Sequence, residues 1–327
     1  MNATEPLAEV RDLTVKFVGR EHTVNAVNGV SFTVNPGEVL CILGESGSGK
    51  SVTLRALMRL LPPQAKIEGT VRAVGQDVLA LRGKELRDLR GGAVSMIFQE
   101  PMTALDPVYT VGQQIGETIR RHTGASREQA RARALELLNL VRIPSAERRL
   151  DAYPHELSGG LRQRAMIAMA LSCDPKLLLA DEPTTALDAT VQIQVLILLR
   201  KLQRELGMGM IFVTHDLGVA AEIADTVAVM YAGRVVESGP VTRIMANPLH
   251  PYTAGLLAST VHGQPRDRDI DAIPGSPPDM RRLPTGCSFA PRCSRRLDGC
   301  RDAVPTERYP EPGRMAACIA LDEPALA

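Results

Sequence analysis

The sequence predicts an α/β fold in which helices cover a buried, largely parallel sheet. Two observations lead to this prediction. Short β-type runs alternate with helical patterns along the chain, and a glycine-rich turn connects the first clear strand to the helix after it. Several of the runs are almost wholly apolar, as expected of strands that are covered on both faces.

The elements follow one another in a regular order. A strand at 39–44, "VLCILG", leads into the glycine turn, and "SVTLRALMRLL" at 51–61 has a helical pattern. Further apolar strands are expected in "VSMIFQ", "KLLLAD" and "MGMIFVTH", which end at residues 99, 181 and 215. The segment "VQIQVLILLRKLQREL" at 191–206 predicts a helix between the last two strands.

A helical subdomain is expected inside the sheet domain, at about 103–175. Some seventy residues there contain no convincing strand. In "SREQARARALELLNLV" apolar residues recur at helical spacing behind a capping box formed by Ser126 and Gln129. We therefore predict one domain over 7–250. The proline-rich and charged segment 263–286 then predicts an irregular extension over 251–327.

Charge and hydropathy exclude several classes of protein. The chain of 327 residues has 38 Lys and Arg against 37 Asp and Glu, so its overall charge would not attract nucleic acid or anionic lipid. No apolar run approaches the roughly 18 residues of a membrane-spanning helix, and the start has no signal-peptide core. We expect a globular protein on the cytosolic side.

The glycine turn "GESGSGKS" at 44–51 predicts a phosphate-binding loop, because it matches G-x-x-x-x-G-K-[ST] between a strand and a helix. Its glycines let the backbone approach phosphates, Lys50 would neutralise β and γ oxygens, and Ser51 would ligate Mg²⁺. The expected nucleotide contacts are Gly44, Glu45, Ser46, Gly47, Ser48, Gly49, Lys50, Ser51 and Val52.

Two acidic residues at the end of "KLLLAD" predict the second half of an ATPase site. Asp181 would face the metal, and Glu182 could orient or deprotonate a water molecule. A buried pair of acids can also be structural, and the sequence leaves open which carboxylate moves the proton.

A second glycine loop, "LSGGLRQR" at 157–164, could bind an anion through Ser158, Gly159 and Gly160 at a helix N-terminus. Alone, it would be read as a helix cap. Together with "LLLADEP", "TTALDA", a glutamine after "MIF" and "VTHD", in this order, it resembles the ATP-binding subunit of an ABC transporter over residues 7–250.

The resemblance implies that two such subunits pack head to tail, with each ATP between the phosphate loop of one and the signature loop "LSGG" of the other. By the same resemblance Gln99 senses Mg²⁺ and the attacking water, Asp188 communicates across the dimer, and His215 contacts the γ-phosphate. An aromatic residue that stacks on adenine is expected near the end of the first strand. Phe17 is the candidate, although it could equally belong to the core.

The segments "NPLHPYTAGLLAS" and "IPGSPPDMRRLPTGCSFAPRC" resemble the C-terminal extension of ATPases that drive dipeptide and oligopeptide import, a branch that also serves nickel and glutathione importers. Many members have Asn where this chain has Asp106. The resemblance implies a second, similar ATPase, two permease subunits and an extracytoplasmic binding protein. It places the chain on the cytoplasmic face of the inner membrane, held through the permeases, and names no cargo.

Four cysteines crowd the extension with the spacing C-x5-C-x6-C-x17-C, which fits neither zinc ribbons nor the usual ferredoxin run. In the resembling importers such tails hold a 4Fe-4S cluster. We therefore expect that cluster, with Zn²⁺ or unligated thiols as alternatives, and we expect it to lie outside the ATP motifs. The proposed ligands are Cys287, Cys293, Cys300 and Cys318.

Three functions remain in competition. The first is an import motor driven by MgATP. The second is a soluble ABC ATPase of translation or DNA repair, against which stand the single cassette and the lack of sustained heptads or a basic stripe. The third is a regulatory subunit that binds ATP without hydrolysing it, against which stand Lys50, Asp181, Glu182 and His215.

Overall fold

The structure is a computed structural model that describes residues 5–100, 104–185, 187–259 and 272–322. The polypeptide divides into two compact units. The first consists of 1–8, 33–38 and 72–212, and the second of 9–32, 39–71 and 213–327. Within the described ranges, no helix combines the length and the apolar character needed to span a membrane.

The sheet of the first unit consists of the predicted apolar strands. Its order is β8-β7-β6, and β6 runs parallel to β7 with Val94 opposite Leu177. Every residue of these strands is buried, which confirms the expectation of covered, parallel strands. The strands are β6 (Val94–Ile97), β7 (Leu177–Asp181) and β8 (Gly209–Thr214), and the long helix that follows β7 is α8 (Ala189–Leu206).

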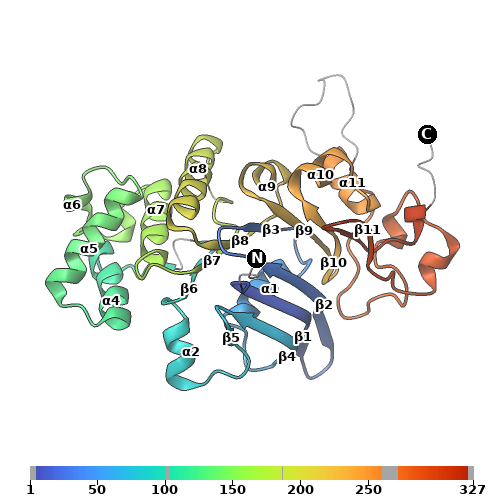
Figure 1. Ribbon diagram of the computed structural model, residues 1–327, viewed down its shortest axis with the longest axis horizontal. Helices are drawn as coiled ribbons and strands as arrows, with labels where there is room; N and C mark the ends of the chain where they lie inside the picture. Colours follow the sequence, from blue (N-terminus) through green and yellow to red (C-terminus); the bar gives the residue numbers. More distant parts are fainter. Residues whose placement is uncertain (1–4, 101–103, 186, 260–271, 323–327) are drawn as a thin grey trace. The chain divides into compact units, whose positions relative to one another are not determined.

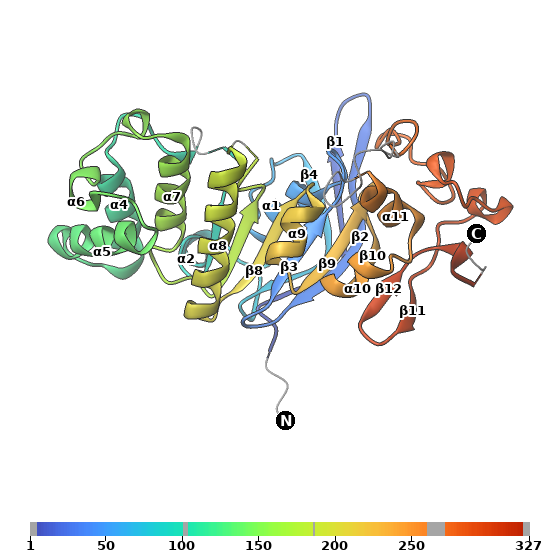
Figure 2. The ribbon, with the colours of Figure 1, turned by 90° about the horizontal axis from the view of Figure 1, so that it is seen from above.

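A cluster of helices occupies the segment between β6 and β7, as Figures 1 and 2 both show. The predicted capping box is confirmed: Ser126 Oγ accepts from the Gln129 N–H at 3.2 Å, and Gln129 Oε1 accepts from the Ser126 N–H at 2.9 Å. The buried faces of three helices pack against one another. The helices are α4 (Val111–Thr123), α5 (Arg127–Leu140), α6 (Ala146–Arg149) and α7 (Gly159–Ala170), with a 3-10 turn at Pro154–Glu156.

An additional sheet lies mainly in the second unit and was not predicted. Its strands have the order β2-β1-β4, and in the first unit β5 (Gln76–Asp77) pairs antiparallel with the end of β4. One small helix, α2 (Gly83–Leu89), follows. The strands are β1 (Ala8–Val18), β2 (Thr23–Val34) and β4 (Ala65–Ala73).

The second unit also contains five strands in the order β11-β12-β10-β9-β3. The strand β3 is parallel to β9, and β9 and β10 form an antiparallel hairpin whose turn residues Ala232 and Gly233 have φ of 48° and 77°. The strands are β3 (Val39–Leu43), β9 (Thr226–Tyr231), β10 (Arg234–Pro240), β11 (Arg308–Glu311) and β12 (Arg314–Ala316). The helices are α1 (Lys50–Leu57), α9 (Leu217–Ile223), α10 (Val241–Ala246) and α11 (Pro251–Ala258).

The cysteine-bearing extension is irregular, as predicted, but it also adds strands to this sheet. Its strand β12 pairs antiparallel with β10, with Ala316 opposite Glu237. Within the described residues from 272 onward, short 3-10 turns lie at Ala290–Arg292, Asp298–Arg301 and Ile319–Asp322, and most of the remainder has no regular secondary structure. The extension is therefore hydrogen-bonded to the second unit through its own backbone.

Candidate nucleotide site

The phosphate loop connects β3 to α1, and its backbone accepts only glycine at two points. A Cβ atom on Gly44 would lie 2.2 Å from the carbonyl oxygen of Met230. Gly49, the N-cap of α1, has a φ of 102°, and a Cβ atom there would lie 2.5 Å from the carbonyl oxygen of Ala26. The glycines thus bring the loop close to β2 and β9 while the following helix starts at Lys50.

Polar groups converge on this loop. Lys50 is 4% exposed, and its Nζ donates to the carbonyl oxygens of Gly44 at 2.7 Å and Glu45 at 3.0 Å. Ser48 Oγ is buried and has no hydrogen-bond partner among the described residues. A buried hydroxyl without a partner is unfavourable unless a ligand supplies one. Phosphate oxygens are acceptors that fit this hydroxyl, the helix N-terminus and the lysine.

The β9–β10 turn holds the phosphate loop in place through hydrogen bonds. The Gly233 N–H donates to the carbonyl oxygen of Ser48 at 2.9 Å, and the Asn28 N–H donates to that of Gly233 at 2.7 Å. Asn28 Nδ2 donates to Ala232 at 3.2 Å. Sequence reasoning missed this support because the three segments are far apart along the chain.

The predicted acidic pair lies at the end of β7 in the first unit. Asp181 is buried, and Glu182 directly follows the strand with a φ of 44°. A left-handed backbone is uncommon for residues other than glycine and occurs often at functional sites. Thr185 Oγ1 donates to Glu182 Oε2 at 2.9 Å, which orients the carboxylate. No sequence signal predicts this backbone strain.

The signature loop forms the start of α7, also in the first unit. Ser158 is the N-cap, and its Oγ accepts from the Leu161 N–H at 3.4 Å. A Cβ atom on Gly159 would meet nothing within 4 Å, whereas one on Gly160 would lie 2.7 Å from Val191 Cγ1 of α8. Gly160 thus permits close helix packing, while Ser158 and Gly159 are exposed at the N-terminus of a helix of 12 residues. Ser158 can therefore cap α7 while the N-terminus of this helix stays accessible to an anion.

The other predicted residues are distributed between the units. Gln99 is exposed just after β6, and Asp188 caps α8 by accepting from the Val191 N–H at 3.0 Å. Both lie in the first unit with the acidic pair and the signature loop. In the second unit, with the phosphate loop, His215 is exposed before α9, and Phe17 is half-buried in β1. The roles of these residues in ATP chemistry stay predictions.

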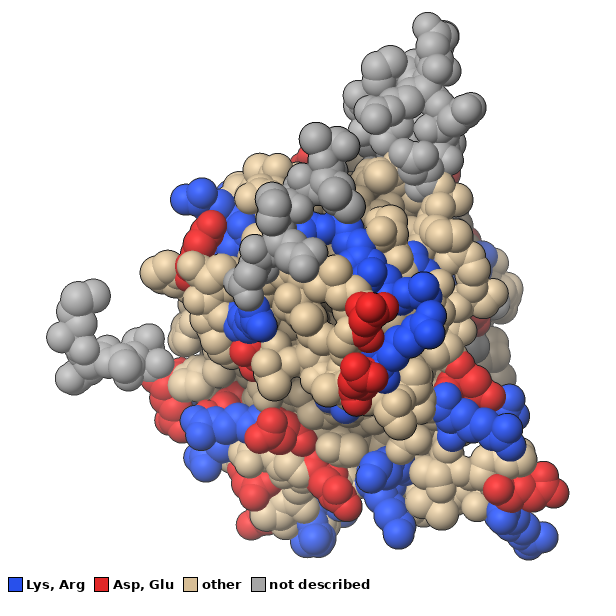
Figure 3. All heavy atoms as spheres, turned by 90° about the vertical axis from the view of Figure 1, so that its right-hand side faces the viewer, with Lys and Arg blue, Asp and Glu red and all other residues tan. Residues whose placement is uncertain are grey.

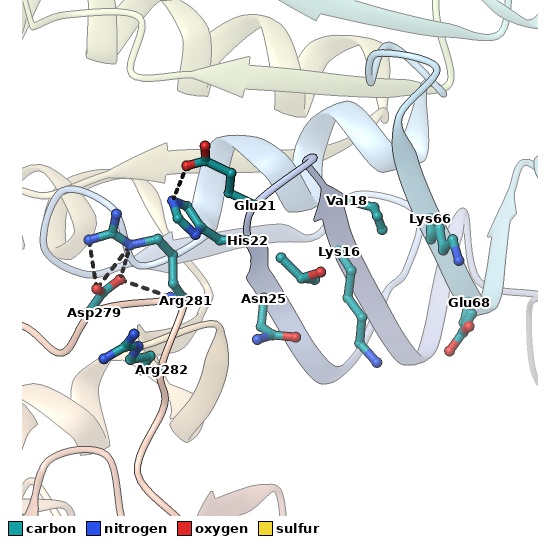
Figure 4. A pocket seen from close by; sticks show the side chains of 11 residues that line it. Lys16, Val18, Glu21, His22, Asn25, Lys66, Glu68, Asp279, Arg281 and Arg282 are labelled. Atoms are coloured by element: carbon teal, nitrogen blue, oxygen red, sulfur yellow. Dashed lines mark hydrogen bonds and ion pairs between the residues drawn. The ribbon is translucent and has the colours of Figure 1, made fainter.

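A groove of about 880 Å³ lies on the sheet that contains Phe17 (Figure 4). Lys16 and Val18 line it, and the intervening Phe17 does not, because side chains alternate along a strand. Its walls mix both charges, including an ion pair of 2.8 Å between Arg281 and Asp279 of the extension. The groove is therefore on the opposite face of β1 from the adenine candidate.

The prediction of a 4Fe-4S cluster is wrong, and the Zn²⁺ alternative is likewise unsupported. No group of three or more His, Cys, Asp or Glu among the described residues could hold a metal ion. The four late cysteines are free thiols around a cavity of about 10 Å³, which is the size of roughly one water molecule. Burial raises the pKa of Cys293 to about 11 and also raises that of Cys287, so in the absence of a metal both are protonated thiols at neutral pH.

The extension reaches the phosphate loop through a residue that the sequence did not indicate. The Arg292 guanidinium forms a two-pronged ion pair with the carboxylate of Glu45. The sequence predicts that the cysteine cluster lies outside the ATP motifs, but Arg292, next to Cys293, contacts the phosphate loop. Cys293 is the only residue of the segment "FAPRC" that the sequence indicates as a site residue, and a pairing across 247 positions leaves no local pattern.

Comparison with known proteins agrees with these features. The ABC transporter family matches residues 27–185, and the "oligopeptide/dipeptide transporter, C-terminal region" matches 236–300. A protein of Brucella melitensis named as a peptide import ATP-binding protein is 50% identical over 98% of both chains. The oligopeptide transport ATP-binding protein OppD of Salmonella typhimurium is 48% identical, over 96% of this chain and 93% of its own.

Solved structures show the same fold. The ATP-binding cassette MJ0796, in a dimeric post-hydrolysis state with ADP and Pi, matches with a TM-score of 0.65 and 31% identity, over 72% of this chain and 98% of that one. The α/β phosphate-loop fold with its helical insertion is thereby confirmed. From the near-full-length relatives and both matching regions, this chain belongs to the ATP-binding proteins of the ABC transporter family and carries the oligopeptide/dipeptide transporter C-terminal region.

Proposed function

We propose that this chain is the ATPase motor of an ABC importer that takes up dipeptides or oligopeptides. One observation carries the proposal: a single chain joins the ABC transporter region at 27–185 to the oligopeptide/dipeptide transporter region at 236–300. The relatives named for peptide import share about half of its residues over nearly the whole length. The free energy of nucleotide binding would move the membrane subunits, and hydrolysis would reset them.

The chain's own residues have distinct tasks in this proposal. The phosphate loop binds the phosphates, with Lys50 as the fixed cation and Ser48 as a further donor. Ser51 and Asp181 are the residues that would hold Mg²⁺, which supplies charge neutralisation on the phosphates. Glu182 orients the attacking water and accepts its proton, and its strained backbone and its bond from Thr185 favour one fixed orientation.

A second subunit would complete each site. Ser158 and Gly159 are exposed at the start of α7, and a partner's γ-phosphate is the anion that fits them. The related cassette MJ0796 has been described as a dimer with ADP and Pi. We propose a head-to-tail arrangement with a similar ATPase, in which Asp188 communicates across the dimer and His215 contacts the γ-phosphate.

The remaining partners would be two permease subunits and an extracytoplasmic binding protein. The exposed Gln99, directly after β6, is the candidate contact to a permease and the sensor of Mg²⁺ and water. We place the chain at the cytoplasmic face of the inner membrane, attached through the permeases. Selection among cargoes then belongs to the permeases and the binding protein.

A nucleic-acid machine is not supported. The near-full-length relatives are named for peptide import or oligopeptide transport. On the face in Figure 3, acidic and basic side chains interleave, which is unlike the continuous basic surface that phosphate backbones require.

Purification from native membranes tests the proposed assembly. A tagged full-length chain, extracted in mild detergent, should bring down two multi-span permeases and a second ATPase, identified by mass spectrometry. Recovery with ribosomal or DNA-repair proteins in place of permeases would reject the proposal.

The nucleotide site has its own test. Lys50→Ala should weaken the affinity of the isolated chain for ATP at least about tenfold, because it removes the buried cation of the loop. Lys66→Ala is the matched control, since it also removes a lysine, but one that lies in the groove of Figure 4 and not in the phosphate loop. Equal ATP affinities of the two variants would contradict the assignment of the loop.

A further inference from the structure

Arg292 connects the C-terminal extension to the phosphate loop by an ion pair in which the arginine is buried and the glutamate is partly exposed. The arginine side chain is 6% exposed, and its Nη1 and Nη2 donate to the two carboxylate oxygens of Glu45 at 2.8 and 3.0 Å. Nη1 also donates to Tyr231 Oη at 3.3 Å, and Nε donates to the Pro274 carbonyl oxygen at 2.8 Å. Such a bidentate geometry fixes both position and orientation.

The other polar groups of Glu45 are held as well. Its backbone N–H donates to Tyr252 Oη of α11 at 3.0 Å. Its carbonyl oxygen accepts from Lys50 Nζ at 3.0 Å and from the Ser48 N–H at 3.2 Å. Side chain and backbone of this one loop residue are thus fixed by the extension, by α11 and by the loop's own lysine.

Aromatic rings surround the arginine side of the pair, whereas the Glu45 side chain is 27% exposed. The ring centroids of Tyr231 and Tyr252 are 4.6 Å apart, and Phe289 lies 5.3 Å from each. The Arg292 guanidinium carbon is 5.8 Å from the centroid of Tyr231, within cation–π range. The hydrogen bonds to Glu45 raise the pKa of Arg292, so its charge is permanent. Because the Arg292 side chain is buried, its charge is unfavourable if it loses its partner.

The extension that supplies Arg292 is anchored on two further sides. The Asn25 N–H at the edge strand β2 donates to the carbonyl oxygen of Met280 at 3.0 Å, next to the groove of Figure 4. The strand β12 pairs with β10. Contacts on both sides of Arg292 in the sequence therefore hold the extension in place next to the phosphate loop.

We propose that Arg292 is a positioning residue for nucleotide binding, which neutralises Glu45 and holds the phosphate loop so that ATP affinity depends on the docked extension. The inference rests on the proposed function, because it takes the loop at 44–51 as the ATP site. A carboxylate in a loop that must accept the phosphates of ATP repels them unless a cation compensates it. Arg292 supplies that cation.

The test is the ATP affinity of the isolated full-length chain, measured by calorimetry with MgATP. Arg292→Gln should weaken binding about tenfold, because it leaves Glu45 negative and unpaired. The double variant Arg292→Gln with Glu45→Gln should recover to within about threefold of wild type, since the repelling charge is gone. Arg295→Gln, on an arginine of the same extension that donates to the carbonyl oxygen of Ala320, should leave ATP affinity unchanged.

Glu45→Gln alone keeps the test decisive if Arg292→Gln does not fold. It leaves the Arg292 charge near the phosphates, so ATP should bind at least as tightly as to wild type, although the melting temperature falls. Weaker ATP binding by Glu45→Gln, unchanged binding by Arg292→Gln, or no recovery in the double variant would each overturn the inference. Lys50→Ala, measured in parallel, distinguishes failure of this inference from failure of the proposed ATP site. If Lys50→Ala also binds ATP normally, the loop at 44–51 is not the ATP site.

Discussion

His250 should make the protein sensitive to mild acid. This residue is the N-cap of α11, it is 2% exposed, and its Nδ1 accepts from the Tyr252 N–H at 3.1 Å. Burial lowers the pKa of His250 to about 3. The imidazole is therefore neutral in the folded protein, and Nδ1 can act as an acceptor only in that form.

The sign and size of the effect follow from linkage. Below the pKa of about 6.5 that a histidine has in the unfolded chain, His250 binds a proton in the unfolded state but not in the folded state. The free energy of unfolding therefore falls as the pH falls. The loss is about 1.4 kcal/mol at pH 5.5 and continues until the folded pKa near 3 is reached. With an unfolding entropy of about 2.1 cal/mol/K per residue, 1.4 kcal/mol corresponds in a chain of 327 residues to a decrease of roughly 2 °C in melting temperature.

The assay compares wild type with His250→Asn by scanning calorimetry at pH 7.5 and 5.5. Asparagine also caps helices well but does not titrate in this range, so the variant should lack this part of the acid effect. All other residues are the same in the two proteins, so their contributions cancel in the difference. An equal decrease in melting temperature on acidification of both proteins would refute the reasoning.

Three further predictions concern separate parts of the chain. Gly49→Ala should lower stability by at least about 1–3 kcal/mol and abolish ATP binding, because the φ of 102° and the oxygen of Ala26 leave no room for a Cβ; normal ATP binding would contradict this. Arg314→Met should cost about 3–5 kcal/mol in calorimetry, because it leaves the buried Glu237 carboxylate without its ion pair of 3.2 Å, and a loss below 1 kcal/mol would count against it. Ser158→Arg should preserve ATP binding by the isolated chain but prevent ATP-dependent association with the partner ATPase in gel filtration, and surviving association would remove the signature loop from the interface.

Local patterns in the sequence predicted a large part of the fold. The capping box at Ser126 and the helical spacing of apolar residues in and just after α5 depend on neighbours within one or two helical turns. The spaced residues are all buried: Ala130, Ala134, Leu137, Leu138 and Val141. The phosphate loop was equally predictable, because strand, glycines, Lys50 and helix are contiguous. Short-range physical chemistry determines these features.

Features that depend on distant pairs were missed. The sheet order β2-β1-β4 and the pairing of β12 with β10 join segments whose partners no local pattern specifies. The ion pair of Arg292 with Glu45 spans 247 positions, and the left-handed backbone of Glu182 reflects its surroundings in the fold. The cysteine spacing misled for the same reason, because spacing alone does not determine whether thiols are placed and ionised for a metal.

Peptide uptake by the assembled complex tests the central claim most directly. Proteoliposomes holding the purified complex would contain MgATP on the side of this chain and a labelled oligopeptide with its binding protein on the other. Glu182→Gln should reduce both ATP hydrolysis and peptide uptake at least about a hundredfold while ATP still binds, because general-base groups contribute about 10²- to 10⁴-fold. Uptake by this variant near the wild-type rate, or hydrolysis by wild type without any peptide uptake, would contradict the assignment of the chain as the motor of a peptide importer.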